Sequence, residues 1–316
     1  LDKVVVDEPS IVARDIQTNE IVAIGTRAQQ MHGKTHKKIE TIRPLKDGVI
    51  SDFQSSEQMI RGFIKMIPRK RTLFSPTLKM VICIPSGVTE VEKRAVIDSA
   101  EHAGAKEVFL IHEPMAAAIG IGIDVLEPNG NMVIDIGGGT TEIAVISLGG
   151  IVTEKSIRIA GDEFTDNIKN YMKTRHNIAI GETTAERIKI NVGSALTELD
   201  EPPANYPVHG RDLMTGIPKE IVVTYKEIAG AMNNSIEQIE EAIMSALFKT
   251  PPELSADIYN TGLYLTGGGS MLRGLDKRIS QKTKLPVYVA EDPLRAVARG
   301  TGIALKNIEK FPFLIK

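Results

Sequence analysis

An internal repeat limits this chain to folds built from two similar halves. In each half a strand-like segment ends in an acidic residue and a proline, and small residues follow; the two copies are 107–117 and 286–296. Proline suits the first turn of a helix, and small residues let two helices cross closely. Paired glycines follow both copies: Gly120 with Gly122, and Gly300 with Gly302. The pattern predicts an α/β fold made of two copies of a βββαβαβα unit.

Hydrophobic periodicity and helix caps place the elements of the two copies. Thr89 with Glu92, and Thr183 with Glu186, have the spacing of a capping box, which predicts a helix start at each. Expected strands lie at 4–7, 10–14, 20–24, 78–84, 107–111, 131–136, 141–147, 150–159, 262–266 and 286–290. Expected helices lie at 55–67, 90–103, 114–121, 162–175, 227–248, 270–282 and 293–305. Because the second copy starts with a strand and a glycine turn, the repeat predicts a strand and a phosphate loop upstream of Leu1, and thus a truncated N-terminus.

Three consecutive glycines occur twice, at 137–139 and 267–269, each time after an apolar strand-like stretch. Such turns bring bare N–H groups close to a phosphate, where a side chain would block the approach. The first run is expected at the tip of a β-hairpin. The second is expected to open a helix whose N-terminus favours an anion or a polar ring. Each run alone is also consistent with a simple tight turn. Both together, with Asp135 entering the first, predict amides from the two halves that meet across a cleft and hold a triphosphate.

Composition excludes several classes of protein. The 316 residues suggest about two domains. The balance of 38 Lys+Arg against 40 Asp+Glu gives no reason to expect a nucleic-acid partner. The single cysteine, Cys83, lies in an apolar run and is expected to be a buried residue in a reducing compartment. No apolar stretch approaches the roughly 18 residues that span a bilayer, and no signal peptide opens the sequence. We therefore expect a soluble, cytoplasmic protein.

The ordered motifs resemble the MreB family of bacterial actin homologues, and the resemblance covers nearly the whole chain. The glycine runs alone would also admit sugar kinases, DnaK-type chaperones and other bacterial actins, but the complete set is narrower. The motifs are Glu113–Gly120, Asp135–Glu142, Gly161–Phe164, Thr184–Lys189, Pro251–Leu254, Leu265–Ser270 and Glu291–Leu294. The resemblance implies an actin-like (ribonuclease H-like) fold. It has two lobes around a nucleotide cleft, each with an inserted small subdomain, and it binds ATP with Mg²⁺.

The resemblance also implies boundaries and a biological role. Domain IA would comprise 1–12 and 54–121 with the C-terminal helix 303–316, domain IB 13–53, domain IIA 122–161 and 225–302, and domain IIB 162–224. The family polymerises on ATP into paired antiparallel protofilaments on the inner face of the cell membrane. There it guides cell-wall elongation with MreC, MreD, RodZ and wall-synthesis enzymes. The alternative is a sugar-type or acetate-type kinase of the same superfamily, although the insertion at 196–226 shows no sugar-binding signature.

Residue roles follow for the phosphate end of the expected site. Asp135 would hold Mg²⁺ through a water molecule, although it could simply cap the turn. The backbone of Gly137, Gly138, Gly139 and Thr140 would bind the β- and γ-phosphates. The Thr140 hydroxyl and Glu113 would position the attacking water, with Glu113 as the general base. Glu113 could instead be only an acidic residue at a helix start. Hydrolysis is expected to be slow, because no arginine finger is implied.

The nucleoside end is assigned by the same resemblance. Glu186 would accept hydrogen bonds from the ribose hydroxyls and Lys189 would flank the base, although simple helix capping is an alternative for Glu186. Nucleoside contacts are expected from the matching segment, Glu186, Arg187, Ile188 and Lys189. Backing for the adenine and ribose is expected from Gly267, Gly268, Gly269 and Ser270.

A second site is expected at 69–76, where a basic triplet precedes Leu73 and Phe74. Cations contribute about 1 kcal/mol each near an anionic membrane, and an apolar tip adds burial. A Leu-Phe pair is also common in a protein core, but in the family this loop faces the membrane. His32 and His36 lie four residues apart among lysines, which favours a solvated loop over a metal site.

Overall fold

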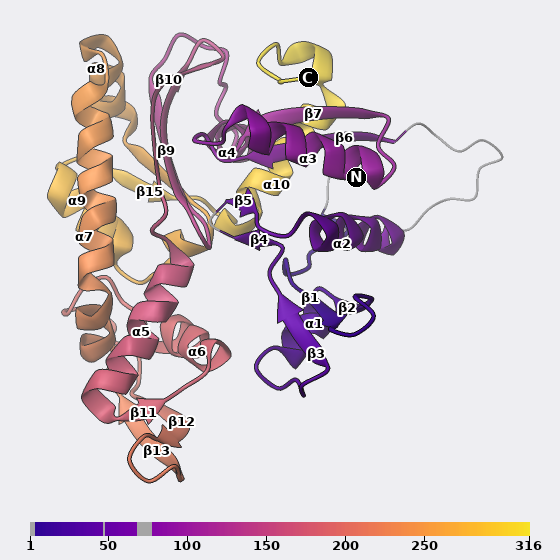
Figure 1. Ribbon diagram of the computed structural model, residues 1–316. Coiled ribbons are helices and arrows are strands. Elements are labelled where there is room, and N and C mark those ends of the chain that lie inside the picture. Colours follow the sequence, from indigo (N-terminus) through magenta and orange to yellow (C-terminus); the bar gives the residue numbers. More distant parts are fainter. Residues whose placement is uncertain (1–3, 47, 68–77) are drawn as a thin grey trace. The chain divides into compact units, whose positions relative to one another are not determined.

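The computed structural model describes residues 4–46, 48–67 and 78–316 and divides into two compact units (Figure 1). Unit 1 takes in Leu1–Gly120 and Val297–Lys316, and unit 2 is Ile121–Ala296. The finer division into four subdomains remains a prediction. None of the described helices is both long and apolar enough to cross a membrane.

Unit 2 is built on a five-stranded sheet in the order β10-β9-β8-β14-β15. Its first three strands form an antiparallel meander, and β14 and β15 run parallel to β8. Every residue of β8 and β9 is buried, as expected for strands with both faces covered. The strands are β8 (Asn131–Ile136), β9 (Thr141–Ser147), β10 (Gly150–Ile157), β14 (Leu263–Thr266) and β15 (Val287–Val289).

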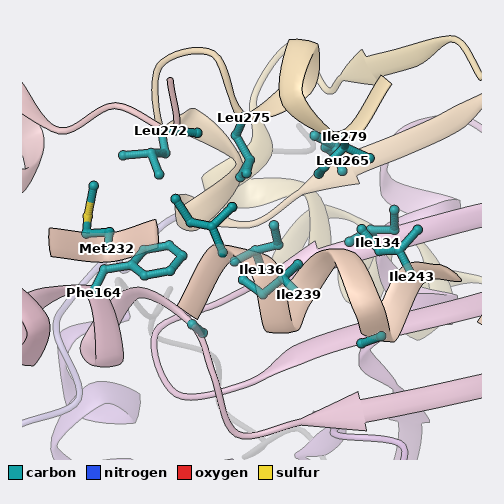
Figure 2. Close-up of a cluster of buried hydrophobic side chains, with 14 of the residues drawn as sticks. Ile134, Ile136, Phe164, Met232, Ile239, Ile243, Leu265, Leu272, Leu275 and Ile279 are labelled. Atoms are coloured by element: carbon teal, nitrogen blue, oxygen red, sulfur yellow. The ribbon is translucent and has the colours of Figure 1, made fainter. Parts of the chain in front are cut away.

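Helices cover this sheet and supply much of its core. The longest, α7, lies alongside β9 and β10 (Figure 1). Figure 2 shows Phe164 of α5 beside Met232 of α7, and Ile136 of β8 beside Ile239 of α7, all within one buried apolar cluster. The helices are α5 (Gly161–His176), α7 (Tyr225–Lys249), α8 (Pro252–Thr261), the 3₁₀ turns η1 (Gly268–Met271) and η2 (Pro293–Arg295), and α9 (Leu275–Thr283).

A small α/β segment is inserted between α5 and α7. Its sheet has the order β11-β12-β13 and packs near α5 and α6. The elements are β11 (Ile178–Ala179), α6 (Glu182–Val192), β12 (Tyr206–Asp212) and β13 (Pro218–Val223).

The capping boxes show where local sequence rules hold and fail. Thr89 caps α3 (Glu90–His102) together with Glu92, as predicted. The predicted capping box of Thr183 with Glu186 is wrong, because α6 already begins at Glu182 with Gly181 as its N-cap. The chain is held in β11 until just before this point, and the amides of Thr184 and Ala185 both donate to Gly181 O. A third capping box, Thr224 with Glu227, starts α7 and was not predicted.

Unit 1 contains three separate small sheets. One has the order β2-β1-β3, a second pairs β4 with β5, and the third pairs β6 with β7 in parallel. The expected strand at 4–7 is not formed, since no described strand pairs with it and Val5 is exposed. The elements are β1 (Val12–Asp15), β2 (Ile21–Ile24), α1 (Thr26–Met31), β3 (Ile39–Ile42), β4 (Leu45–Lys46), β5 (Val49–Ile50), α2 (Phe53–Met66), β6 (Lys79–Ile84), α3 (Glu90–His102), β7 (Glu107–His112), α4 (Glu113–Gly120), α10 (Ala296–Lys306) and the 3₁₀ turn η3 (Ile308–Lys310).

Helices α4 and α10, which the repeat relates to each other, cross closely in unit 1, as predicted. Gly300 of α10 lies directly against the backbone of α4, where a Cβ atom would overlap the carbonyl oxygen of Ala116 and come within 2.8 Å of Gly120 N. Arg299 fastens the same crossing by donating from Nε to Gly120 O (2.6 Å). Gly302, two residues further along α10, has no atom within 4 Å of the corresponding position.

These two glycines give a matched test of the crossing. Gly300→Ala is expected to lower the free energy of unfolding by about 1–3 kcal/mol or more, because the new methyl group meets backbone atoms that cannot rotate away. Gly302→Ala is the control, and its better helix propensity is expected to raise stability by up to about 1 kcal/mol. Urea denaturation of both variants measures the difference. Equal effects at the two positions would show that the helices do not cross this closely.

Candidate functional site

The two glycine turns lie side by side because β14 pairs in parallel with β8. This register places Thr266 opposite Asp135, so both strands end at the same edge of the sheet. Gly267 has φ +78°, and a Cβ atom there would overlap Ile136 O and lie 2.6 Å from Asp135 Oδ1. The predicted proximity of the runs is confirmed. The prediction that they come from the two halves of the molecule is wrong, since both belong to unit 2.

The first turn is the tip of the β8–β9 hairpin, as predicted. The Gly137 N–H donates to Thr140 O (2.9 Å), so this amide closes the turn and is already engaged. Within the described ranges, the amides of Gly138 and Gly139 make no hydrogen bond. Gly138 is exposed, and Thr140 is buried directly before β9. The hairpin therefore presents the amides of its two central glycines to an anion.

The second turn does not open a long helix, and this prediction is wrong. Residues after Gly267 form only the 3₁₀ turn η1, and α9 begins later, at Leu275. Gly274 has a left-handed φ of 72°, which separates the two elements. Hydrogen bonds hold the turn rigidly: Gly267 N–H donates to Pro293 O (3.0 Å), and Ser270 Oγ donates to Gly267 O (2.7 Å). A helix dipole is thus no part of this wall of the site.

Asp135 is a buried carboxyl group at the end of β8. Only 5% of the residue is exposed, and its Oδ1 accepts a hydrogen bond from Thr266 Oγ1 (2.9 Å). Burial raises the pKa of Asp135 to about 6, and the nearby Glu142 adds to this effect. The Thr266 hydroxyl opposes the rise but does not cancel it. Ionising Asp135 in the folded protein therefore costs free energy, and a nearby cation would reduce this cost.

A polar network joins α5 to α6 beside the first turn. Lys189 Nζ donates to Gly161 O (2.7 Å) and to Thr165 Oγ1 (3.0 Å), and it pairs with Glu186 Oε2 (2.7 Å). Gly161 N–H donates to Gly137 O (3.1 Å), and Asp162 N–H donates to Gly138 O (2.7 Å). Hydrogen bonds thus connect the predicted nucleoside residues Glu186 and Lys189 to the tip of the β8–β9 hairpin at residues 137–140, which we call the phosphate hairpin after its predicted role.

Sequence reasoning missed the partners that hold these groups. Thr266, Gly161 and Thr165 received no role, although Gly161 and Thr165 are spaced four residues apart at the start of α5. That spacing places both on one face of the helix and is the signal that could have found them.

The remaining predicted site residues divide into three groups. Ile188 is fully buried in the core of unit 2 and Arg187 is exposed, and their assignment as nucleoside contacts stays a prediction. Glu113 is the first residue of α4 and belongs to unit 1. Leu73 and Phe74 lie outside the described residues.

The donor set suits a magnesium–nucleotide complex better than a protein-enclosed metal. Among the described residues, no group of three or more His, Cys, Asp or Glu side chains could hold a metal ion. Mg²⁺ in nucleotide sites usually keeps several waters and uses one or two carboxylates plus the phosphates. The buried Asp135 beside the glycine turns fits that pattern.

Comparisons with known proteins agree with this geometry. The sequence model of the family described as MreB/Mbl protein matches residues 2–312. The cell shape-determining protein Mbl of Bacillus subtilis (strain 168) is 46% identical over 309 residues, which cover 98% of this chain and 92% of Mbl. The cell shape-determining protein MreB of Escherichia coli (strain K12) is 47% identical over 310 residues, covering 97% of this chain and 88% of MreB.

A solved structure is similar in fold as well as in sequence. The crystal structure of MreB5 of Spiroplasma citri bound to AMPPNP superposes with a TM-score of 0.90 at 38% identity. The match covers 97% of this chain and 91% of MreB5.

The buried Asp135 predicts a pH-dependent stability. Since its pKa is raised from 3.8 to about 6 on folding, the folded state binds the proton more tightly, and stability falls as the pH rises through this range. Asp135→Asn removes the ionisation and still accepts from Thr266. We expect this variant to be more stable than the wild type by roughly 3 kcal/mol above about pH 7, and by little near pH 4. Urea denaturation without nucleotide or divalent cation measures this. A difference that is constant with pH would contradict it.

Proposed function

The chain belongs to the MreB/Mbl family of actin-like proteins, and from this premise we propose that it is an ATP-dependent filament protein of the bacterial cytoskeleton. Its filaments would assemble on the inner face of the cell membrane and direct rod-shaped cell-wall elongation. Slow ATP hydrolysis would set the lifetime of the filament and would not be part of a metabolic reaction.

One observation carries the nucleotide part of the proposal. Two glycine turns end neighbouring parallel strands, and the amides of Gly138 and Gly139 are not used within the described part of the chain. Backbone N–H groups in such a concave turn bind phosphate oxygens. The relative MreB5, similar over nearly its whole length, was crystallised with an ATP analogue.

We propose that the nucleoside contacts lie next to these two glycine turns. Glu186 would accept from the ribose hydroxyls and Lys189 would flank the base, with Arg187 exposed on the same helix. The segment Gly267–Ser270 would back the adenine and ribose. Its internal hydrogen bonds support this role, because a rigid wall needs no ordering when the ligand binds.

The proposed chemistry divides between the ligand and the chain. Bound Mg²⁺ would neutralise charge on the phosphates. Asp135 would hold a water of that ion, and the ion would in turn offset the cost of burying the carboxylate. The Thr140 hydroxyl would help to place the attacking water, and Glu113 would accept its proton. A carboxylate and a hydroxyl without an arginine finger support only slow turnover.

The proposed partners follow from the family. They are further copies of this chain in antiparallel protofilament pairs, membrane lipid through Leu73 and Phe74, and MreC, MreD, RodZ and wall-synthesis enzymes. The described chain approaching this tip ends in Met66 and Ile67, both of which are exposed. Their apolar surface supports a membrane-facing position. No nucleic-acid partner is proposed.

Phosphate release tests the catalytic assignments. Thr140→Ala and Glu113→Ala are each expected to slow the release of phosphate by about tenfold or more, because each removes a group that positions water. ATP affinity is expected to stay within about threefold of the wild-type value, since the loss falls on the reaction and spares binding. Wild-type rates in both variants would remove the two residues from the mechanism.

Sedimentation with vesicles tests assembly and membrane binding together. ATP with Mg²⁺ is expected to pellet the protein without lipid, whereas a soluble monomer that phosphorylates a sugar would support the kinase alternative. Replacing Leu73 and Phe74 by Ala is expected to weaken binding to phosphatidylglycerol vesicles by about tenfold or more, through lost apolar burial.

Met214→Ala is the matched control for the vesicle measurement. Met214 is another strongly exposed apolar residue, 83% exposed, but it lies between β12 and β13 in unit 2. Its truncation is expected to leave vesicle binding unchanged. Equal losses in the control and in the Leu73 and Phe74 variant would show that the effect is not specific to this loop.

A further inference from the structure

Thr165 is a buried hydroxyl on α5 that no proposed step yet uses. Only 3% of the residue is exposed, and its Oγ1 lies 2.8 Å from Glu186 Oε2, 3.0 Å from Gly161 O and 3.0 Å from Lys189 Nζ. The hydroxyl is therefore at the centre of the network that joins α5 to α6.

The chemistry of the neighbours fixes the direction of these hydrogen bonds. Lys189 can only donate, so the Thr165 oxygen accepts from it. The single hydroxyl proton then goes to one of two acceptors. Gly161 O already accepts from Lys189, whereas Glu186 is a carboxylate, and hydrogen bonds to ionised acceptors are the stronger ones. The proton therefore points at Glu186, and the chain of donors runs from Lys189 through Thr165 to Glu186.

Both donors use the same oxygen of Glu186. Lys189 Nζ lies 2.7 Å from Oε2, and Thr165 Oγ1 lies 2.8 Å from the same atom. Oε1 receives no hydrogen bond from any described residue, and 44% of the side chain is exposed. The carboxylate is thus anchored at Oε2, which leaves Oε1 as the oxygen that could accept from a ligand.

We propose that Thr165 is a positioning residue that locks the Glu186 carboxylate for recognition of the ribose hydroxyls and so makes the site selective for ribonucleotides over deoxyribonucleotides. The inference rests on the proposed nucleotide function and assigns the origin of its sugar selectivity. Lys189 alone is a flexible point charge and does not fix the plane of a carboxylate. The short Thr165 side chain, on the buried face of α5, supplies the second, rigid anchor.

The test compares equilibrium dissociation constants for ATP, 2′-deoxy-ATP and 3′-deoxy-ATP in the presence of Mg²⁺. The wild type is expected to prefer ATP over at least one deoxy analogue by about tenfold, the effect of one hydrogen bond to a charged group. Thr165→Val keeps the shape of the side chain but loses the hydroxyl. It is expected to reduce the preference to within about threefold by weakening ATP binding, with little change for that deoxy analogue.

Matched variants separate positioning from general damage. Thr165→Ser retains the hydroxyl and is expected to keep most of the preference. Glu186→Ala is expected to lose it, and adding Thr165→Val to Glu186→Ala is expected to cause no further loss, because the anchored group is gone. Thr165→Ala is a second hydroxyl-free variant for use where Thr165→Val does not fold, as judged by thermal denaturation.

Each contrary result has a distinct meaning. Equal weakening of ATP and both deoxy analogues by Thr165→Val would show a purely structural role and overturn the inference. A wild type that binds ATP without any sugar preference would also overturn it, while leaving the proposed nucleotide function intact. A wild type that does not bind ATP would overturn the proposed function and the inference with it.

Discussion

The parallel pairing of β14 with β8 is the constraint on which the rest of this site depends. It sets Thr266 opposite Asp135 and brings Gly267 against the backbone of Ile136, a distance of more than 120 residues along the chain. Parallel strands end at the same edge of a sheet, so their following turns share one location. A slip of one residue would turn every side chain of β14 to the opposite face of the sheet and shift the second turn away from the first. The register is thus a folding constraint, and it is also a condition for the nucleotide binding that we propose.

Sequence patterns predicted the local elements of unit 2 well, because its strands are buried apolar runs and its helices have strong periodicity. These patterns failed where tertiary contacts set the start or the end of an element. The cap of α6 is set by the pairing of β11, and the break after η1 is set by Gly274; neither is visible in the pattern after Thr183 or Ser270. The origin of the two glycine turns was also mispredicted, since strand order within a sheet is not encoded in either turn. The location of the β8–β9 hairpin tip was predicted correctly, because three consecutive glycines after a strand leave few structures other than a tight turn.

The charged side chains of the site are compensated to different degrees. Lys189 and Glu186 meet each other and share further polar partners, so their charges are balanced within unit 2. Asp135 accepts a hydrogen bond from the Thr266 hydroxyl, with no cationic partner among the described residues, and its pKa is raised, so its negative charge is poorly compensated. Two charges that balance each other within the fold hold their side chains in place. A charge that the fold leaves uncompensated favours the binding of a cation. In the proposed site, the first arrangement lies at the sugar end and the second at the phosphate end.

These two ends are mechanically joined. The carbonyl groups of Gly137 and Gly138 accept from the first amides of α5, and the carbonyl of Gly161 accepts from Lys189. Movement of the phosphate hairpin would therefore displace the N-terminus of α5. Through Lys189 and Thr165 it would also change the position of Glu186. Preorganised contacts of this kind reduce the entropy lost on binding and couple recognition of one end of a ligand to the geometry at the other. Under the proposed function, the groups that would contact the sugar and the phosphates of a nucleotide are all held by the N-terminus of α5, so both ends of the ligand would be recognised together.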